Sequence, residues 1–220
     1  MQKQVNSTTI PLSREALSHE LLQIIQLFHA RGWSMATSTN YSFRNLSPDE
    51  NTYTISKSGV DKSQFKITDF MQINAQGNAL EAYQSFKPSA ETLLHTLLYE
   101  QDKSIQAVLH THSPEATVLS QRYAAQGSIL LSQYEMIKGI AGNSTHDTNI
   151  ELPIFANSQD METLSQEIAL FYENTKHPSK GFLLAGHGLY AWGKNIAEAK
   201  RHIETYEFLL RCEYLKLAIH

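Results

Sequence analysis

The chain has 220 residues, 41% of them hydrophobic, and its 18 basic and 22 acidic side chains give a formal net charge of -4. Proteins that bind the phosphate backbone usually carry a Lys/Arg patch, and no window here is strongly basic, so we expect no nucleic-acid partner. The opening sequence MQKQVNSTTIPLS lacks the apolar core of a signal peptide, and no apolar run approaches the roughly 18 residues of a membrane span, which predicts a cytoplasmic protein without a membrane partner.

The first part of the chain predicts one helix followed by short strands. The helix begins after Ser13, a suitable N-cap, and ends before Gly32. β-like runs over 41–44 and 52–56 flank the turn signal Ser47-Pro48-Asp49 and predict a hairpin. An extended segment over 65–73, a turn at 76–78 and a short strand over 80–83 are expected next.

The remainder alternates helices with strands. Helices are predicted from Ser89, from Pro114 to about residue 123, over 161–172 and from Asn195, with strands over 105–109, 128–131, 182–185 and 189–192 and a turn at His177-Pro178-Ser179. This α/β alternation, without repeats or linkers, predicts a single domain over residues 1–220.

Histidines supply the candidate metal ligands. His110 and His112 end the run AVLHTHS, and side chains two apart in a strand point to the same face. His187 follows the apolar run FLLA between two glycines, which permit close backbone approach. Three imidazoles with an open fourth position are typical of catalytic zinc. The single cysteine, Cys212, excludes a thiolate cluster.

Other histidines are weaker candidates. His146, in the polar loop AGNSTHDTN, could reach a site. The rest of those considered lie in predicted helices and are expected to be surface or internally hydrogen-bonded residues: His19, His29, His95 and His202.

Two glutamates stand in suggestive contexts. Glu91 lies in KPSAETLLH, at a helix start, where it could serve a site or simply complement the helix dipole. Glu135 lies in SQYEMIKGIAG, where Met136 and Ile137 predict a partly buried setting that could tune a carboxyl for acid/base work, although a lone glutamate is more often solvated.

Two loops of small polar residues at strand ends could donate hydrogen bonds to a phosphate. They are Ser38-Thr39-Asn40, with Ser42, and Ser56-Lys57-Ser58-Gly59. Taken singly, each could equally be an ordinary turn.

In combination and order, the motifs resemble those of the class II aldolase/adducin family. The segments that carry the resemblance are Thr39-Asn40-Tyr41-Ser42, Ser58-Gly59, Pro88-Ser89-Ala90-Glu91, His110-Thr111-His112 and Gly186-His187-Gly188. It covers nearly the whole chain, and KPSAETLLH, AVLHTHS, YEMIKGI and the closing helix are most similar to the dehydratase branch.

The resemblance implies an α/β fold, a three-layer α/β/α sandwich with a mainly antiparallel central sheet. It also implies a homotetramer with sites near subunit interfaces and a phosphorylated ketose substrate that carries a methylthio group. One zinc ion (Zn2+) per subunit would be held by His110, His112 and His187. Glu135 is the acid/base of the dehydratase branch and Glu91 that of the aldolases, and the phosphate would contact Asn40, Ser58, Gly59 and Ser89.

Two departures and three alternatives accompany the resemblance. The family pattern often has Gly where Thr39 stands, and some dehydratases have a cysteine near the PSxE motif where this chain has none. A zinc-dependent sugar-phosphate aldolase and an inactive, oligomerising metal-binding module are the alternatives. A TIM-barrel metallohydrolase is disfavoured because that barrel typically needs about 250 residues.

Overall fold

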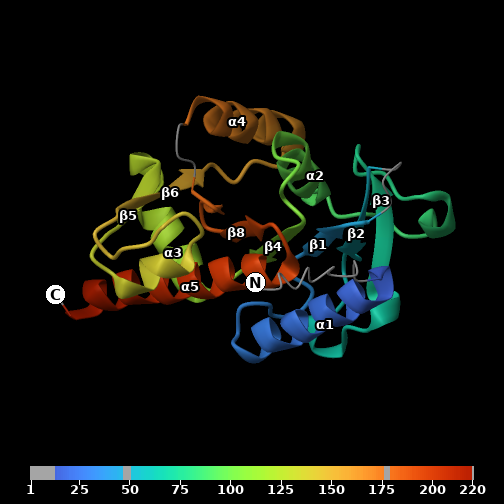
Figure 1. Cartoon of the computed structure of the whole chain (residues 1–220), viewed down its shortest axis with the longest axis horizontal. Helices are drawn as coiled ribbons and strands as arrows, with labels where there is room; N and C mark the ends of the chain where they lie inside the picture. The colour runs from blue at the N-terminus through green and yellow to red at the C-terminus, as the bar shows by residue number, and fades with distance from the viewer. Residues whose placement is uncertain (1–12, 47–50, 176–178, 220) are drawn as a thin grey trace, which may run out of the picture.

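The computed structural model describes residues 13–46, 51–175 and 179–219, whose helices and strands form a layered α/β structure (Figure 1). The helices are α1 (Arg14–Ala30), α2 (Thr92–Gln101), α3 (Pro114–Arg122), α4 (Met161–Asn174) and α5 (Ile196–Ile219). The strands are β1 (Tyr41–Arg44), β2 (Thr52–Ser56), β3 (Phe70–Asn74), β4 (Ala107–Thr111), β5 (Ser128–Leu131), β6 (Ile150–Phe155), β7 (Gly181–Leu184) and β8 (Gly188–Gly193).

The strands form one eight-stranded sheet in the order β3-β2-β1-β4-β8-β7-β6-β5. Neighbouring strands are antiparallel, except that β6 and β7 run parallel. The expected mainly antiparallel sheet is therefore confirmed.

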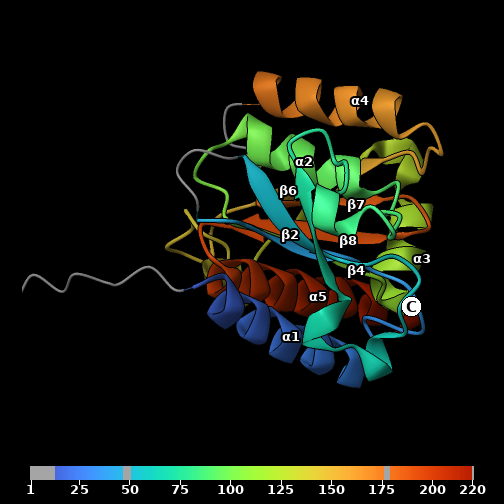
Figure 2. The ribbon, with the colours of Figure 1, turned by 90° about the vertical axis from the view of Figure 1, so that its right-hand side faces the viewer.

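Helices cover both faces of the sheet (Figure 2). On one face, α2 and α4 pack together over a core that includes Leu94, Leu98, Tyr190 and Trp192. On the other face, α1, α3 and α5 cover a second core that contains Leu109. Because successive residues of a strand point to opposite faces, β4 contributes side chains to both cores.

Serine side chains cap two of the helices, and the cap at Ser13 is the predicted one, whereas the helix predicted from Ser89 begins at Thr92. The Ser13 hydroxyl accepts from the Ala16 N–H at 3.2 Å, and the Ser113 hydroxyl accepts from the Ala116 N–H at 3.0 Å. The strand β4 therefore passes into α3 within three residues, which brings the second histidine of HTH directly before a helix cap.

Two predictions differ from the structure, and one strand is missing from the predictions. The predicted strand over 80–83 is wrong: it is a 3-10 helix, Glu81–Tyr83, preceded by a single bridge between Ile73 and Ala79. A 3-10 turn, Ile67–Asp69, interrupts the expected extended segment before β3. The strand β6 was not predicted, since Pro153 within IELPIF is unfavourable in most strands.

The predicted turn Ser47-Pro48-Asp49 and most of the turn at His177-Pro178-Ser179 lie outside the described residues. Within the described part of the chain, no helix combines the length and apolar character needed to cross a membrane.

Candidate metal centre

Four side chains converge at the end of β4: the imidazoles of His110, His112 and His187 and the carboxylate of Glu91. One ligand atom from each lies within 4.8 Å of the corresponding atoms of the others. The Nε2 atom of His110 is 2.7 Å from that of His112 and 3.4 Å from that of His187. Oε1 of Glu91 is 2.9 Å from Nε2 of His187. This set could hold a metal ion.

The other ring nitrogens of two imidazoles are occupied by acceptors. Nδ1 of His110 donates to the Leu189 carbonyl at 3.0 Å, and Nδ1 of His187 donates to Oδ1 of Asn157 at 3.2 Å. A neutral imidazole carries one N–H, so both Nε2 atoms present lone pairs to the cluster. Such lone pairs facing a carboxylate fit a cation, and metal-binding histidines commonly have partners of this kind behind them.

The electrostatics also favour ligation at neutral pH. Burial, followed by the proximity of His112, lowers the pKa of His110 well below its usual value, and burial lowers the pKa of His112 to about 4. Burial opposes ionisation of Glu91, but its contacts with His187 and the other imidazoles hold the pKa of its carboxyl well below the usual range. The rings of His110 and His112 are thus neutral and the Glu91 carboxyl is ionised at pH 7, as metal binding requires.

Glycines let the two histidine-bearing segments approach. Gly186 has φ +66°, which closes the turn between β7 and β8. A Cβ on Gly188 would collide with the Thr111 carbonyl and lie 2.9 Å from Cδ2 of His112. The pattern GHG is therefore required by close contact between β8 and the end of β4.

Residues expected to hold a phosphate occupy different settings. Asn40 is 3% exposed, and its amide Nδ2 donates to Oε2 of Glu91. Ser89 is half-buried, and its hydroxyl accepts from the Glu91 N–H at 3.3 Å. Ser58 and Gly59 lie in an exposed turn after β2. The structure thus brings Asn40 and Ser89 to Glu91.

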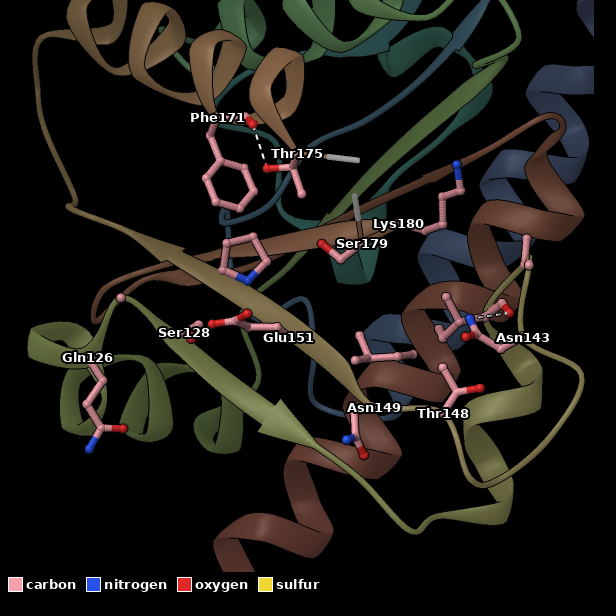
Figure 3. A pocket seen from close by; sticks show the side chains of 16 residues that line it. Gln126, Ser128, Asn143, Thr148, Asn149, Glu151, Phe171, Thr175, Ser179 and Lys180 are labelled. Carbon is pink, nitrogen blue, oxygen red and sulfur yellow. Dashed lines mark hydrogen bonds between the residues drawn. The ribbon is translucent and has the colours of Figure 1, made fainter. Parts of the chain in front are cut away.

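A cavity of about 780 Å³ lies elsewhere, lined by residues of β5, β6, the end of α4 and the segment 140–149 (Figure 3). Among the described residues that line it are Ser128, Glu151, Phe171 and Lys180, and none of its lining residues belongs to the four-residue cluster. The converging ligand atoms, and not this cavity, identify the candidate site.

Residues 19–214 match the model of a family described as Class II Aldolase and Adducin N-terminal domain. The chain belongs to the class II aldolase and adducin family.

Relatives within this family are similar over nearly their full length. A protein of Picosynechococcus sp. named methylthioribulose-1-phosphate dehydratase is 48% identical over 208 residues, covering 94% of this chain and 96% of the relative. One of the same name from Xanthomonas campestris pv. campestris is 44% identical over 214 residues, covering 95% of each chain.

Solved structures show the class II aldolase fold. An L-fuculose 1-phosphate aldolase superposes with a TM-score of 0.74 at 21% identity, covering 94% of this chain and 89% of that one. The L-fuculose-1-phosphate aldolase from Thermus Thermophilus gives a TM-score of 0.70 at 23% identity, covering 92% of this chain and 97% of that one.

Thr39, which departs from the class II aldolase pattern, has a strained backbone conformation. Thr39 has φ +70°, a left-handed conformation that is unfavourable for a β-branched residue and costs about 1 to 3 kcal/mol. Its hydroxyl lies 2.6 Å from that of Ser34, which also accepts from the Tyr41 hydroxyl at 2.9 Å. These buried hydrogen bonds stabilise a conformation that glycine would adopt without strain.

Glu135 lies outside the cluster, and its predicted partly buried setting is wrong. Its side chain is 72% exposed, forms an ion pair with Lys138 and lies 3.6 Å from Nδ1 of His146. The hydrogen bond from Lys138 lowers the pKa of the Glu135 carboxyl. Only Ile137 of its 3-10 segment, Glu135–Gly139, is buried, and the segment packs against α5, on the sheet face opposite to α2 and Glu91.

Sequence patterns alone misplace or miss three residues. The sequence pattern places His110 only at the end of an apolar run, but it is fully buried in β4, and its ring centroid lies 3.9 Å from that of Tyr190. His95 is fully buried beside Asn40. The ammonium of Lys62, 1% exposed, donates to the Val60 carbonyl at 3.1 Å, and burial lowers its pKa to about 8. Polar residues at regular spacing on α2 were the available signal for His95.

A buried carboxyl lies behind the cluster, on the other face of β4. Oε1 of Glu207, on α5, accepts from the Thr111 hydroxyl at 2.5 Å, while Oε2 has no hydrogen-bond partner among the described residues. Burial raises the pKa of Glu207 from 4.5 to about 7. Because the folded protein binds this proton more tightly than the unfolded chain, protonation of Glu207 stabilises the fold. This stabilisation is fully present below pH 4.5 and is lost as the pH rises through 7.

We expect Glu207→Gln to stabilise the protein at pH 8 by up to about 3 kcal/mol and at pH 5 by less than about 1 kcal/mol, since glutamine cannot ionise. Urea unfolding at both pH values measures the difference, with the exposed Glu162→Gln as the control. An equal gain at pH 5 and pH 8 would show that packing, not charge, causes it.

Proposed function

We propose that this chain eliminates water from 5-methylthioribulose 1-phosphate to give 2,3-diketo-5-methylthiopentyl 1-phosphate, a step of methionine salvage. The observation that carries the proposal is the 44% to 48% identity, over nearly complete chains, with relatives named methylthioribulose-1-phosphate dehydratase. The chain is thus a lyase of the class II aldolase family.

We assign His110, His112 and His187 as the ligands of one zinc ion per subunit, with Glu91 beside them. Bound zinc would act as a Lewis acid toward the carbonyl oxygen of the ketose. The assignment is supported by the converging Nε2 atoms of the three rings and by burial, which keeps His110 and His112 neutral at pH 7.

The chain supplies the acid and base. Elimination removes a proton from C3 of the substrate and releases the C4 hydroxyl as water, and the resulting enol becomes the second ketone. We assign Glu135 to the proton transfers, by similarity to the dehydratase branch, and keep Glu91 as the alternative because it lies in the cluster. A positioned carboxyl typically contributes about a hundredfold or more to such a step.

The phosphate would be held where the two small-residue loops meet. The Lys62 N–H donates to the Ala36 carbonyl at 2.9 Å, which joins the turn carrying Ser58 and Gly59 to the loop before Asn40. Ser89 completes the proposed set. Hydroxyl groups, amides and free backbone N–H groups are suitable donors for phosphate oxygens.

We propose a cytoplasmic homotetramer with the site near a subunit interface. This assembly is supported by the family resemblance and by the position of Glu135, whose segment lies on the sheet face opposite to Glu91. A contribution from a second subunit would allow both carboxyls to serve one site.

The deciding experiment offers the purified protein methylthioribulose 1-phosphate and, in parallel, fuculose 1-phosphate. We expect the first to lose water and form the diketone while the second stays intact. Cleavage of a carbon–carbon bond in fuculose 1-phosphate would instead support the aldolase alternative. No turnover, with less than about half an equivalent of zinc under conditions that keep metal bound, would support the inactive module.

A further inference from the structure

Five polar side chains interleave between α2 and β1 behind the metal centre. Glu91, His95 and Tyr99 are spaced four residues apart, so they share one face at the start and along the length of α2. Asn40 and Ser42 are two apart and share one face of the strand. Except for Glu91, all are fully or almost fully buried.

The hydrogen bonds at the Glu91 end have fixed directions. A carboxylate only accepts, so the Asn40 amide must present Nδ2 to Oε2 of Glu91. Oδ1 of Asn40 then faces Nε2 of His95 at 2.5 Å. An amide oxygen also only accepts, so the proton of the His95 ring must be on Nε2.

The hydrogen bonds at the other end of this row of five side chains fix the remaining donors and acceptors. A neutral imidazole protonated on Nε2 has a bare Nδ1, which accepts from the Ser42 hydroxyl at 2.7 Å. The Ser42 oxygen in turn accepts from the Tyr99 hydroxyl at 2.8 Å. Burial lowers the pKa of His95 to about 3, which agrees with a neutral ring. Every donor in the row therefore points toward Glu91.

We propose that His95 is a positioning residue of the metal centre: its Nε2–H fixes the Asn40 amide so that Nδ2 holds Oε2 of Glu91, leaving Oε1 directed at His187. Without the His95 donor, Oδ1 of Asn40 would have no partner, and the amide would be free to rotate so that Nδ2 no longer holds Oε2 of Glu91. The inference rests on the proposed function only in taking Glu91 as part of the metal centre.

Two substitutions of His95 distinguish the role of its Nε2 from that of its Nδ1. The amide nitrogen of glutamine can reach the position of Nε2, whereas asparagine reaches only that of Nδ1. We expect His95→Asn to weaken zinc binding by about 10- to 100-fold, the usual effect of losing an outer hydrogen-bond partner of a metal site. His95→Gln should bind zinc within about threefold of the unchanged protein, because it keeps the donor to Asn40.

Zinc affinity is measured by competition with a chelator, a readout that does not depend on which substrate the enzyme uses. The matched control is His202→Asn: His202 is also fully buried, with Nδ1 2.6 Å from the Trp192 carbonyl and Nε2 accepting from the Ala141 N–H. It should lower stability and leave zinc affinity unchanged. Equal loss of affinity in His95→Gln and His95→Asn, or in His202→Asn, would overturn the proposal.

A spectroscopic measurement on the unchanged protein avoids any failure to fold. Nitrogen-15 NMR of the zinc-loaded enzyme should show His95 as a neutral ring protonated at Nε2 and bare at Nδ1. Protonation at Nδ1 would overturn the proposal. Because neither measurement involves dehydration, a protein that lacked dehydratase activity could still satisfy both, so the two proposals fail independently.

Discussion

Replacing His187 with alanine is expected to remove bound zinc and abolish dehydration while leaving the chain folded. His187 would supply one of three imidazole ligands, and two remaining imidazoles hold zinc far more weakly. Its side chain is 16% exposed and lies in the turn between β7 and β8, so truncation leaves little empty space in the core. Zinc content by elemental analysis, activity and circular dichroism measure the three outcomes.

Two comparisons make the result specific. His110→Ala should also lose zinc, but it removes a fully buried ring that stacks on Tyr190, so we expect an additional loss of stability of about 2 to 4 kcal/mol. His19→Ala, at an exposed position of α1, should keep zinc and activity. One full equivalent of zinc in His187→Ala would disprove the ligand assignment.

Changing Glu135 to glutamine is expected to lower the dehydration rate by at least about a hundredfold while zinc stays bound. Glutamine keeps the size of the side chain but cannot exchange a proton, and the exposed position of Glu135 leaves the fold unaffected. Single-turnover kinetics and zinc content measure the effect, with Glu162→Gln as the control. An unchanged rate would move the acid/base role to Glu91.

Glu91→Gln distinguishes the two carboxyls further. Because Glu91 lies among the imidazoles, we expect its variant to lose zinc affinity as well as rate. Mixing subunits of His187→Ala with subunits of Glu135→Gln tests the proposed shared site. Recovery of activity in the mixed assembly requires a Glu135 from one subunit to act at the metal centre of another.

Local sequence patterns predicted the elements whose signals are contained within a few residues. The bounds of β1, β2 and β5 match the predicted runs, and Ser113-Pro114 correctly starts α3. The failures depend on distant contacts. β6 is a strand because it pairs with β5 on one side and β7 on the other, which outweighs the unfavourable Pro153.

In the candidate site, too, some features follow from local sequence patterns and others depend on distant contacts. Motif order was sufficient to select the three histidines and Glu91, which the structure brings together. It could not show that Asn40 and Ser89 contact Glu91 or that Glu135 is exposed, because these facts depend on how α2, α5 and the sheet pack. The sequence presents His95 as one helical histidine among several, since only the packing of α2 against β1 reveals its partners.

The sheet order has a consequence for how the proposed metal centre would form. His110 and His187 lie 77 positions apart in the chain, and they meet only when β4 pairs with β8. Such long-range contacts form late in folding, after the entropy cost of closing large loops has been met. The proposed zinc ion would therefore not nucleate this fold as zinc does in a zinc finger: we expect the apoprotein to assemble its sheet first and to take up metal afterwards.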